Sequence, residues 1–189
     1  MHYHAALVDD EPLYQQIVSS RITAGLQALG CSCVVSVFGC DDDLLDAMKN
    51  QSFDMFFLDI AVWGYNGIHL AQKLRKMGIV APITFVSAME DQVFEAFRVQ
   101  PLGFIRKSAM DRDFPPLLER LVVQLENMES QKIQISAKEG QLLLRTGDIL
   151  YVESSNKVQL VHIANKVLEA RHNMSYFESK LPKDVSIRS

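Results

Sequence analysis

Cysteine is scarce in this sequence, and long apolar runs are absent. Three cysteines occur among 189 residues, and Cys31, Cys33 and Cys40 form neither an even disulfide framework nor a four-ligand zinc set. No uninterrupted apolar run approaches the roughly 20 residues that a membrane span needs. Acidic residues appear within the first ten positions, which is not typical of a secretory signal. These absences exclude secreted, membrane-spanning and zinc-ribbon proteins and favour a cytoplasmic protein with reduced thiols.

Charge is small overall but unevenly distributed. The net charge is −4, and 48% of the residues are hydrophobic, which is enough to bury a sizeable core. Residues 1–128 carry 10 Lys and Arg against 16 Asp and Glu, whereas residues 129–189 carry 9 against 7. This difference predicts two domains, 1–128 and 129–189, that meet different partners. A net charge of +2 in the second is too weak to establish a nucleic-acid surface.

Short apolar runs alternate with helical patterns through residues 1–128. The apolar runs predict five strands, at residues 5–8, 33–38, 55–58, 82–86 and 103–105. The helical patterns predict five helices, at residues 12–29, 41–49, 67–77, 90–99 and 114–128. Five strand–helix units predict an α/β fold, a doubly wound parallel sheet with helices on both faces and right-handed crossovers.

Two of these helices have candidate inner faces. The first has apolar residues at roughly helical spacing: Leu13, Ile17, Ile22, Leu26 and Leu29. In the helix at 90–99, the apolar contacts are expected from Val93, Phe94 and Phe97. Two roles stay open for Phe94 and Phe97, packing in the core or forming a dimer face.

Residues 129–189 have a different character. Short segments separated by turn residues predict strands at 133–137, 141–145, 149–153, 158–163 and 166–171, followed by a helix at 174–181. Partial alternation of apolar and polar residues predicts antiparallel pairing in a smaller, mainly-β domain. No closing element follows the helix, so we expect a truncated domain, and about 60 residues is close to the size at which a core becomes marginal.

Polar residues follow the predicted strands of the first domain. Asp9 and Asp10 follow the first strand and Asp59 the third, while Ser87 and Lys107 end the fourth and fifth. Ligands of open α/β sheets bind outside the carboxyl ends of the strands, where strand order reverses. With the order 2-1-3-4-5, the three aspartates converge on one crevice, and their repulsion favours a bound cation.

This constellation suits phosphoryl transfer. Oxygen ligands with open coordination positions are typical of Mg²⁺. A carboxylate beside the ion can act as a nucleophile and become an aspartyl-phosphate. Lys107 and Ser87 then offer a cation and a hydroxyl to the transferring oxygens.

Four stretches resemble the receiver domains of two-component response regulators, which have a flavodoxin-like fold. They are L-V-D-D-E-P at 7–12, F-F-L-D-I-A-V-W-G-Y-N-G-I at 56–68, I-T-F-V-S-A at 83–88 and G-F-I-R-K at 103–107. The resemblance implies that a sensor histidine kinase phosphorylates Asp59. It also implies that Asp10, Asp59 and the backbone carbonyl of Ala61 hold Mg²⁺, with Asp9 helping through water.

The same resemblance assigns a conformational switch. Ser87 and Lys107 match the family's hydroxyl and lysine, and Phe104 matches the aromatic residue that turns inward after phosphorylation. Two positions depart from the family, which usually has proline at the positions of Trp63 and Ser108. The second proline normally follows a cis bond, which before serine costs about 2.5–4 kcal/mol. Either this bond is trans and Lys107 is aimed differently, or the surroundings enforce a cis bond.

The second domain resembles the start of a LytTR-type DNA-binding domain. The resemblance rests on I-L-Y-V-E-S-S-N-K-V-Q-L-V-H at 149–162 and Y-F-E-S-K-L-P at 176–182. In that family loops between strands enter the DNA grooves, which implies DNA contacts from Asn156 and Lys157. An ordinary polar hairpin turn is the alternative for both residues. The family's His-(Lys/Arg)-Ser segment is expected just after Arg188.

These features support one leading hypothesis, a response regulator in which phosphorylation of Asp59 switches homodimerisation and DNA binding to control transcription. The alternative is a phosphorylation-dependent protein-interaction module that does not bind DNA. An aspartyl phosphatase or mutase is disfavoured, because such enzymes commonly need a second acid at the position of Ala61. We therefore expect no enzymatic activity beyond Mg²⁺-dependent self-phosphorylation and self-dephosphorylation.

Overall fold

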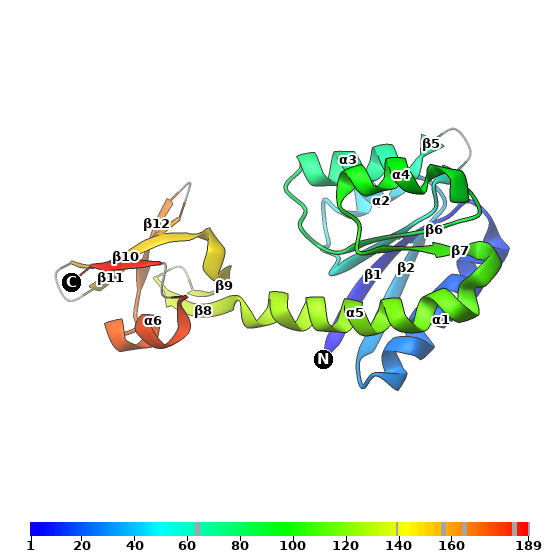
Figure 1. Cartoon of the computed structure of the whole chain (residues 1–189). Helices are drawn as coiled ribbons and strands as arrows, with labels where there is room; N and C mark the ends of the chain where they lie inside the picture. The colour runs from blue at the N-terminus through cyan, green and yellow to red at the C-terminus, as the bar shows by residue number, and fades with distance from the viewer. Residues whose placement is uncertain (63–64, 139, 156–157, 164–165, 183–184, 189) are drawn as a thin grey trace. The chain divides into compact units, whose positions relative to one another are not determined.

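The computed structural model describes residues 1–62, 65–138, 140–155, 158–163, 166–182 and 185–188. It divides into two compact units, Met1–Leu125 and Glu126–Ser189 (Figure 1). The division falls inside a helix, whereas the sequence placed the domain boundary after residue 128. Among the described residues, no helix combines the length and apolar character that crossing a bilayer requires.

A five-stranded parallel sheet forms the centre of the first unit. Its strands are β1 (His2–Val8), β2 (Ser32–Phe38), β3 (Met55–Leu58), β6 (Ile83–Ser87) and β7 (Gly103–Arg106). They lie in the order β2-β1-β3-β6-β7, which confirms the predicted doubly wound order 2-1-3-4-5. The strands are rich in apolar residues because helices cover the sheet on both faces.

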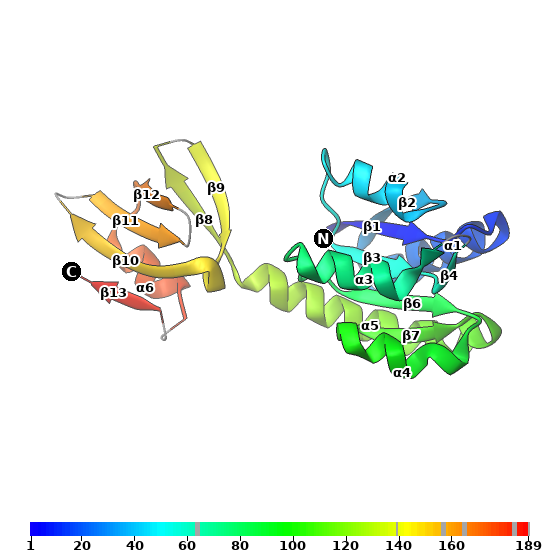
Figure 2. The same ribbon diagram turned by 90° about the horizontal axis from the view of Figure 1, so that it is seen from above.

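Helices form a layer on each face of this sheet (Figures 1 and 2). They are α1 (Pro12–Ala28), α2 (Asp41–Ala47), α3 (Gly67–Lys76), α4 (Val93–Ala96) and α5 (Met110–Ser130). Neighbouring residues of a strand point to opposite faces, so Phe57 packs with α1 and α5 while Phe56 packs with α2, α3 and α4. Directly after β3, a small antiparallel pair, β4 (Ala61–Val62) and β5 (Tyr65–Asn66), was not predicted.

The structure corrects the predicted inner face of α1. The fully buried residues are Val18, Ile22 and Leu26, at a regular spacing of four. Leu13 is 65% exposed, because nine residues at 100° each place it opposite Ile22 on the helix. Leu29 is also exposed, because it caps the end of the helix instead of lying within it.

At residues 90–99 the structure corrects both the length of the predicted α-helix and the side of it that faces the core. Only α4 is α-helical, and it lies between two 3₁₀ turns, Glu90–Gln92 and Phe97–Val99. The buried residues of this segment are Ala96 in α4 and Val99 in the second 3₁₀ turn, three positions apart. Phe94 is 86% exposed and Phe97 is 62% exposed, so neither packs in the core.

The second unit is a mainly-β sheet with one helix on it, as predicted. The strands are β8 (Lys132–Ala137), β9 (Gly140–Arg145), β10 (Ile149–Ser155), β11 (Val158–Ile163), β12 (Lys166–Ala170) and β13 (Ser186–Arg188). Their order is β13-β10-β11-β12-β8-β9. Helix α6 (Met174–Lys180) buries Phe177 against apolar residues of one sheet face, including Val152, Val161 and Leu168.

Strand β13 was not predicted from the sequence. This strand pairs in parallel with β10, through Val152 and Ile187, whereas the other pairs in this sheet are antiparallel. Three residues are too few to show a periodicity. Its place in the sheet also corrects the expectation that nothing follows the helix.

Candidate functional site

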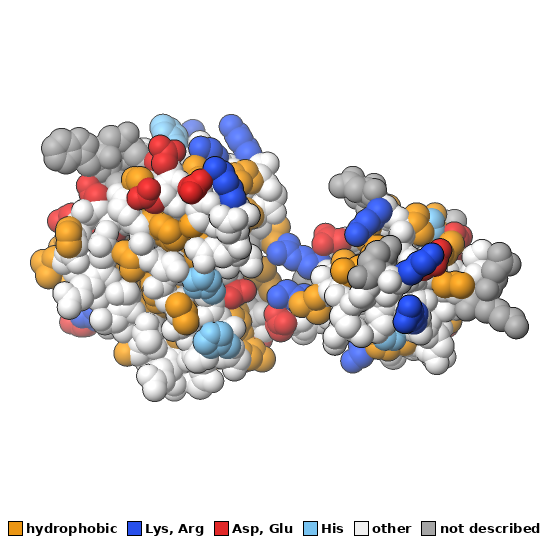
Figure 3. Space-filling view, turned by 180° about the vertical axis from the view of Figure 1, so that it is seen from behind, with side chains coloured by type: hydrophobic (Ala, Val, Ile, Leu, Met, Phe, Trp, Pro, Cys, Tyr) orange, Lys and Arg blue, Asp and Glu red, His pale blue; other side chains and the backbone are white. Residues whose placement is uncertain are grey.

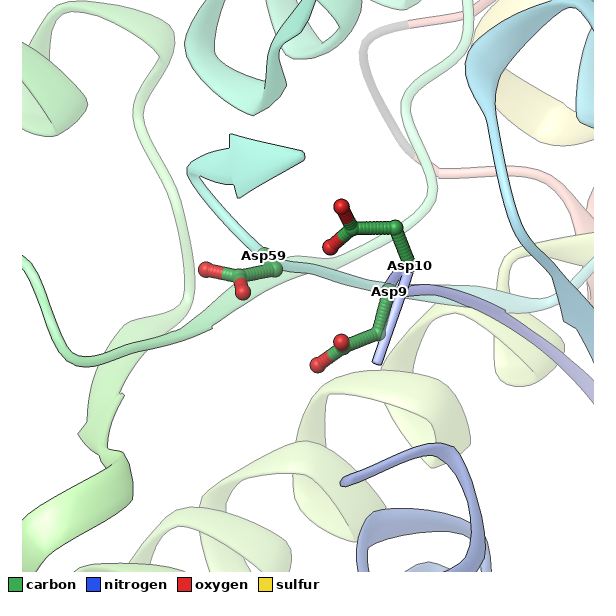
Figure 4. A group of neighbouring side chains, drawn as sticks. All are labelled: Asp9, Asp10 and Asp59. Carbon is green, nitrogen blue, oxygen red and sulfur yellow. The ribbon is translucent and has the colours of Figure 1, made fainter. Parts of the chain in front are cut away.

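Three carboxylates meet at the carboxyl end of the first sheet. Asp9 and Asp10 follow β1 and Asp59 follows β3, and these strands are neighbours with Val8 opposite Leu58. The Asp59 N–H donates to the Val8 carbonyl across 2.9 Å. One carboxylate oxygen from each aspartate lies within 4.8 Å of the others, and the three side chains extend from adjoining strand ends (Figure 4). The expected convergence is therefore present in the fold.

Lys107 enters this cluster from the end of β7. Its Nζ lies 2.6 Å from Asp59 Oδ2, 2.9 Å from Asp9 Oδ2 and 3.2 Å from Glu11 Oε1. The lysine side chain is only 2% exposed. The bond between Lys107 and Ser108 is trans, yet the lysine points into the cluster, so the expectation that a trans bond redirects it is wrong. The contacts of Lys107 with the acidic groups fix its direction.

The Lys107 ammonium and the Asp9 carboxylate are both charged groups in a buried place. Burial lowers the pKa of Lys107, but its contacts with Asp59 and Asp9 outweigh burial and hold the pKa above its ordinary value. Burial raises the pKa of Asp9, although the ion pair with Lys107 and the hydrogen bond from the Glu11 N–H oppose the increase. Lys107 therefore stays protonated, and Asp9 holds its charge less readily than an ordinary carboxylate.

The donor set fits a small divalent cation. Asp9 Oδ2 is buried, and among the described residues it accepts no hydrogen bond of good geometry, although Lys107 Nζ is at ion-pair distance. A buried oxygen of this kind is rare without a partner. Asp10 and Asp59 add two more carboxylates, the hard ligands that Mg²⁺ prefers. One ammonium against three neighbouring carboxylates also leaves negative charge for a cation to neutralise.

Ala61 lies beside this cluster. Its N–H donates to Asp59 Oδ1 across 3.3 Å, and it pairs with Asn66 in the small antiparallel pair. These contacts hold the backbone at Ala61, two residues after Asp59. The metal-ligand role of the Ala61 carbonyl stays a prediction.

Ser87 lies at the end of β6, the strand next to β3 in the sheet, and Phe104 lies on β7, the edge strand beside β6. Ser87 is fully buried at the end of β6, and its hydroxyl accepts a hydrogen bond from the Met89 N–H across 3.3 Å. Phe104 is partly buried and packs against the core on the α3 and α4 side. Both residues lie on the strands predicted for them. The inward movement of Ser87 and Phe104 after phosphorylation stays a prediction.

A bidentate ion pair anchors the strand that carries Lys107. Arg106 Nε lies 2.7 Å from Asp113 Oδ2, and Arg106 Nη2 lies 2.7 Å from Asp113 Oδ1. The Arg106 N–H also donates to Asp113 Oδ2, so the carboxylate joins the end of β7 to the first turns of α5. These hydrogen bonds hold the pKa of Asp113 below its ordinary value.

This ion pair predicts a pH-dependent stability. Because the Asp113 pKa is lower in the folded chain, its contribution is present above the unfolded pKa and is lost as pH falls through the folded pKa. Asp113→Asn is expected to cost about 1 kcal/mol at pH 7, since the pair is partly exposed. Urea unfolding at pH 7 and in acid measures the difference. An equal cost at both pH values contradicts the assignment.

Three residues of the site could not be predicted from the sequence. In the sequence, Glu11 is one acidic residue of the stretch at 7–12 and Tyr14 is one residue of the first predicted helix, but both contact Lys107 in the structure. Gly67 belongs to the stretch at 56–68 that resembles receiver domains, and nothing in that stretch indicates a special role for it. A Cβ at Gly67 would lie 2.9 Å from the Asp59 carbonyl carbon and still closer to its oxygen, so a side chain has no room there. Only the conformation of the chain reveals these contacts.

The predicted DNA contacts Asn156 and Lys157 lie outside the described residues. The strands on either side of them are described, and Ser155 of β10 pairs with Val158 of β11. Trp63, the other departure from the family pattern, also lies outside the described residues.

Comparison with known proteins agrees with both units. The sequence model of the response regulator receiver domain family matches residues 5–121. The sensory transduction protein LytT of Enterococcus faecalis is 24% identical, over 98% of this chain and 79% of the relative. The transcriptional regulatory protein YpdB of Escherichia coli K12 is 26% identical, over 93% of this chain and 75% of the relative.

A solved structure agrees with the first unit. The crystal structure of the response regulatory domain of MrkE from Klebsiella pneumoniae has a TM-score of 0.59 and 27% identity, over 66% of this chain and 98% of that chain. The buried aspartates and lysine occupy the strand ends that the receiver resemblance implied. The chain therefore belongs to the response regulator receiver domain family, and it has the architecture of a receiver domain followed by a LytTR-type second unit.

Proposed function

We propose that Asp59 accepts a phosphoryl group from a sensor histidine kinase and that this modification switches homodimerisation and DNA binding. The observation that carries the proposal is the contact between Asp59 and Lys107, 2.6 Å apart within the buried acidic cluster. A carboxylate nucleophile needs a nearby positive charge as phosphoryl oxygens approach it. The site places that charge at Asp59 itself.

The transfer step follows from the groups present. A lone pair of the Asp59 carboxylate forms an O–P bond, while the P–N bond of the kinase phosphohistidine breaks and its electron pair returns to the imidazole. Lys107 donates an N–H to a phosphoryl oxygen, and Ser87 offers its hydroxyl to another after it leaves the Met89 N–H. Mg²⁺ held by Asp9, Asp10, Asp59 and the Ala61 carbonyl would neutralise charge on the transferring group.

The consequence of phosphorylation is a change in equilibrium between two conformations. Ser87 moves towards the phosphoryl group and Phe104 follows it inward. Dimerisation responds only if the second conformation binds its partner copy more tightly than the first. We propose no further enzymatic activity beyond self-phosphorylation from a phosphodonor and self-dephosphorylation.

Replacing the acceptor tests this proposal. After incubation with acetyl phosphate and MgCl₂, intact mass is expected to show one added phosphoryl group on the wild type, and peptide mapping to locate it at Asp59. Asp59→Asn is expected to abolish the addition, because an amide is a poor nucleophile. Asp43→Asn, an exposed acid at the start of α2, is the control and keeps it. Incorporation that persists in Asp59→Asn overturns the assignment.

The second unit has exposed cations suited to DNA phosphates (Figure 3). Lys138 and Arg171 are exposed, and Arg171 follows Ala170, which pairs with Gln159 near the start of β11. The Lys138 N–H donates to the Glu169 carbonyl and the Arg171 N–H to the Ser136 carbonyl. Arg171 therefore lies close to the start of β11, and we propose that this end of the sheet, together with Asn156 and Lys157, contacts DNA.

Salt dependence tests the DNA proposal. In gel shifts with a mixed-sequence duplex, log affinity is expected to fall linearly with log salt, and each lost phosphate contact reduces the slope by about 0.9. Arg171→Ala and Lys157→Ala are each expected to show that reduction. Lys166→Ala, an exposed lysine at the other end of β12, is the control. Equal slopes for Arg171→Ala and Lys166→Ala contradict the proposed surface.

A protein-interaction module without DNA binding is the second candidate. The observation that favours it is the small net charge of residues 129–189, 9 Lys and Arg against 7 Asp and Glu. A phosphorylated protein that gives no shift at low salt, where phosphate contacts are strongest, supports this candidate.

A further inference from the structure

Lys107 has two neighbours beyond the aspartates of the site. Its Nζ lies 3.9 Å from the centroid of the Tyr14 ring, in cation–π contact, and 3.2 Å from Glu11 Oε1. Both residues belong to the start of α1, whereas Asp9 and Asp59 end strands. The lysine is 2% exposed although Glu11 is 58% exposed, so Glu11 and the Tyr14 ring contact an ammonium that is shielded from solvent.

The start of α1 is fastened to Asp9. The Glu11 N–H donates to Asp9 Oδ1 across 2.9 Å, and Gln15 Nε2 donates to the Asp9 carbonyl across 2.6 Å. Pro12 occupies the first turn, where its fixed φ suits a helix start. Tyr14 is partly buried and packs against the α1 and α5 core. Its ring is therefore held in one place relative to the acidic cluster.

The Tyr14 ring attracts the ammonium in a way that the carboxylates do not. Asp9 and Asp59 are the carboxylates that would also bind a cation or a phosphoryl group, so their contacts with Lys107 would change when either arrives. An aromatic face attracts a cation through its quadrupole and needs no directed N–H. The ring contact therefore uses none of the three N–H donors of the lysine, and it can persist when an incoming oxygen replaces one of the carboxylate neighbours Asp59, Asp9 and Glu11.

We propose that Tyr14 is a positioning residue that holds the Lys107 ammonium beside Asp59 through its ring face, so that Lys107 meets the phosphoryl group without rearrangement. This inference rests on the proposed function of Asp59. It assigns to α1 a part in the phosphorylation site that its sequence did not indicate.

Three variants separate this role from simple packing. Tyr14→Leu removes the aromatic face, Tyr14→Phe keeps it, and Leu13→Ala alters an exposed neighbour on the same turn. Tyr14→Leu is expected to weaken beryllofluoride binding in the presence of Mg²⁺, and to slow phosphorylation by acetyl phosphate, by about fivefold, the size of a modest cation–π contact. Its Mg²⁺ affinity, measured by calorimetry without beryllofluoride, is expected to stay near that of the wild type. Tyr14→Phe restores both properties.

A second readout needs neither metal nor phosphate. Reductive methylation of the Mg²⁺-free protein, followed by peptide mapping, measures how freely the Lys107 amine reacts. The amine is expected to be protected in the wild type and Tyr14→Phe, and to react several-fold faster in Tyr14→Leu. Leu13→Ala is expected to match the wild type.

Each contrary result is distinct. The proposal is overturned if Tyr14→Leu equals the wild type, if Tyr14→Phe is equally impaired, or if Tyr14→Leu lowers Mg²⁺ and beryllofluoride affinity to the same extent. If the wild type takes up neither beryllofluoride nor phosphate, the proposed function of Asp59 fails. In that case, the methylation of Lys107 still decides whether Tyr14 holds the amine.

Discussion

Lys107→Ala is expected to destabilise the Mg²⁺-free protein by about 3 kcal/mol, because removing one partner of a buried ion pair leaves the other charges uncompensated. In this protein the uncompensated groups are Asp9 and Asp59, both almost fully buried, together with the adjacent Asp10. Urea unfolding at neutral pH measures the loss. Lys49→Ala is the control, since its ion pair with Asp46 is exposed and contributes little.

The same variant is expected to respond strongly to charge compensation. Saturating MgCl₂ should stabilise Lys107→Ala more than the wild type, and adding Asp59→Asn to Lys107→Ala should recover part of the loss. Because burial already raises the pKa of Asp9, protonation in acid should also reduce the deficit. A loss that is unchanged by Mg²⁺, by acid and by the second substitution contradicts the electrostatic explanation.

Gly67→Ala is expected to destabilise the first unit and to lower the phosphorylation rate. In an ordinary helix the change from glycine to alanine is favourable by about 1 kcal/mol. At Gly67 the added Cβ meets the Asp59 carbonyl, and backbone atoms cannot move aside as a side chain does. Overpacking of this kind costs about 1–3 kcal/mol, and a displacement of 1 Å at a reacting group can lower its rate about 10²-fold.

Two other glycines provide a graded control for this prediction. A Cβ at Gly39 meets no atom within 4 Å, whereas at Gly103 it meets the end of the flexible Leu117 side chain. The expected order of destabilisation is therefore Gly39→Ala, Gly103→Ala and then Gly67→Ala. Urea unfolding and the acetyl phosphate reaction measure the two effects. A stabilised Gly67→Ala variant contradicts the close approach to Asp59.

Much of the first unit was predictable from local patterns. The buried strands of a parallel sheet read as continuous apolar runs, and β3 was predicted at its observed bounds. Phe94 and Phe97 show where such patterns fail, because an apolar residue on a short helical segment does not reveal which side faces the sheet. Their exposure follows from the orientation of α4, which only its packing against α3 and the sheet decides.

The convergence of the acidic residues in the candidate site could be predicted from the sequence, but the contacts of Lys107 could not. Asp9, Asp10 and Asp59 could be brought together because strand ends of a parallel sheet share one edge. The direction of the Lys107 side chain could not be predicted, because the sequence suggested that a trans bond before Ser108 would point this side chain away from the aspartates. The contacts with Asp59, Asp9 and Glu11 decide that direction, and they join segments distant in the chain.

The amino-acid sequence alone determined the alternation of strands and helices, the acidic residues at the strand ends and the change to a mainly-β second unit. These properties depend on periodicity and on neighbours in the chain, which any reader of the sequence can see. The tertiary structure decided that Tyr14 contacts the Lys107 ammonium, that Gly67 lies against the Asp59 backbone and that β13 joins β10. Such contacts depend on distances between segments far apart in the chain, and only the packed fold sets those distances.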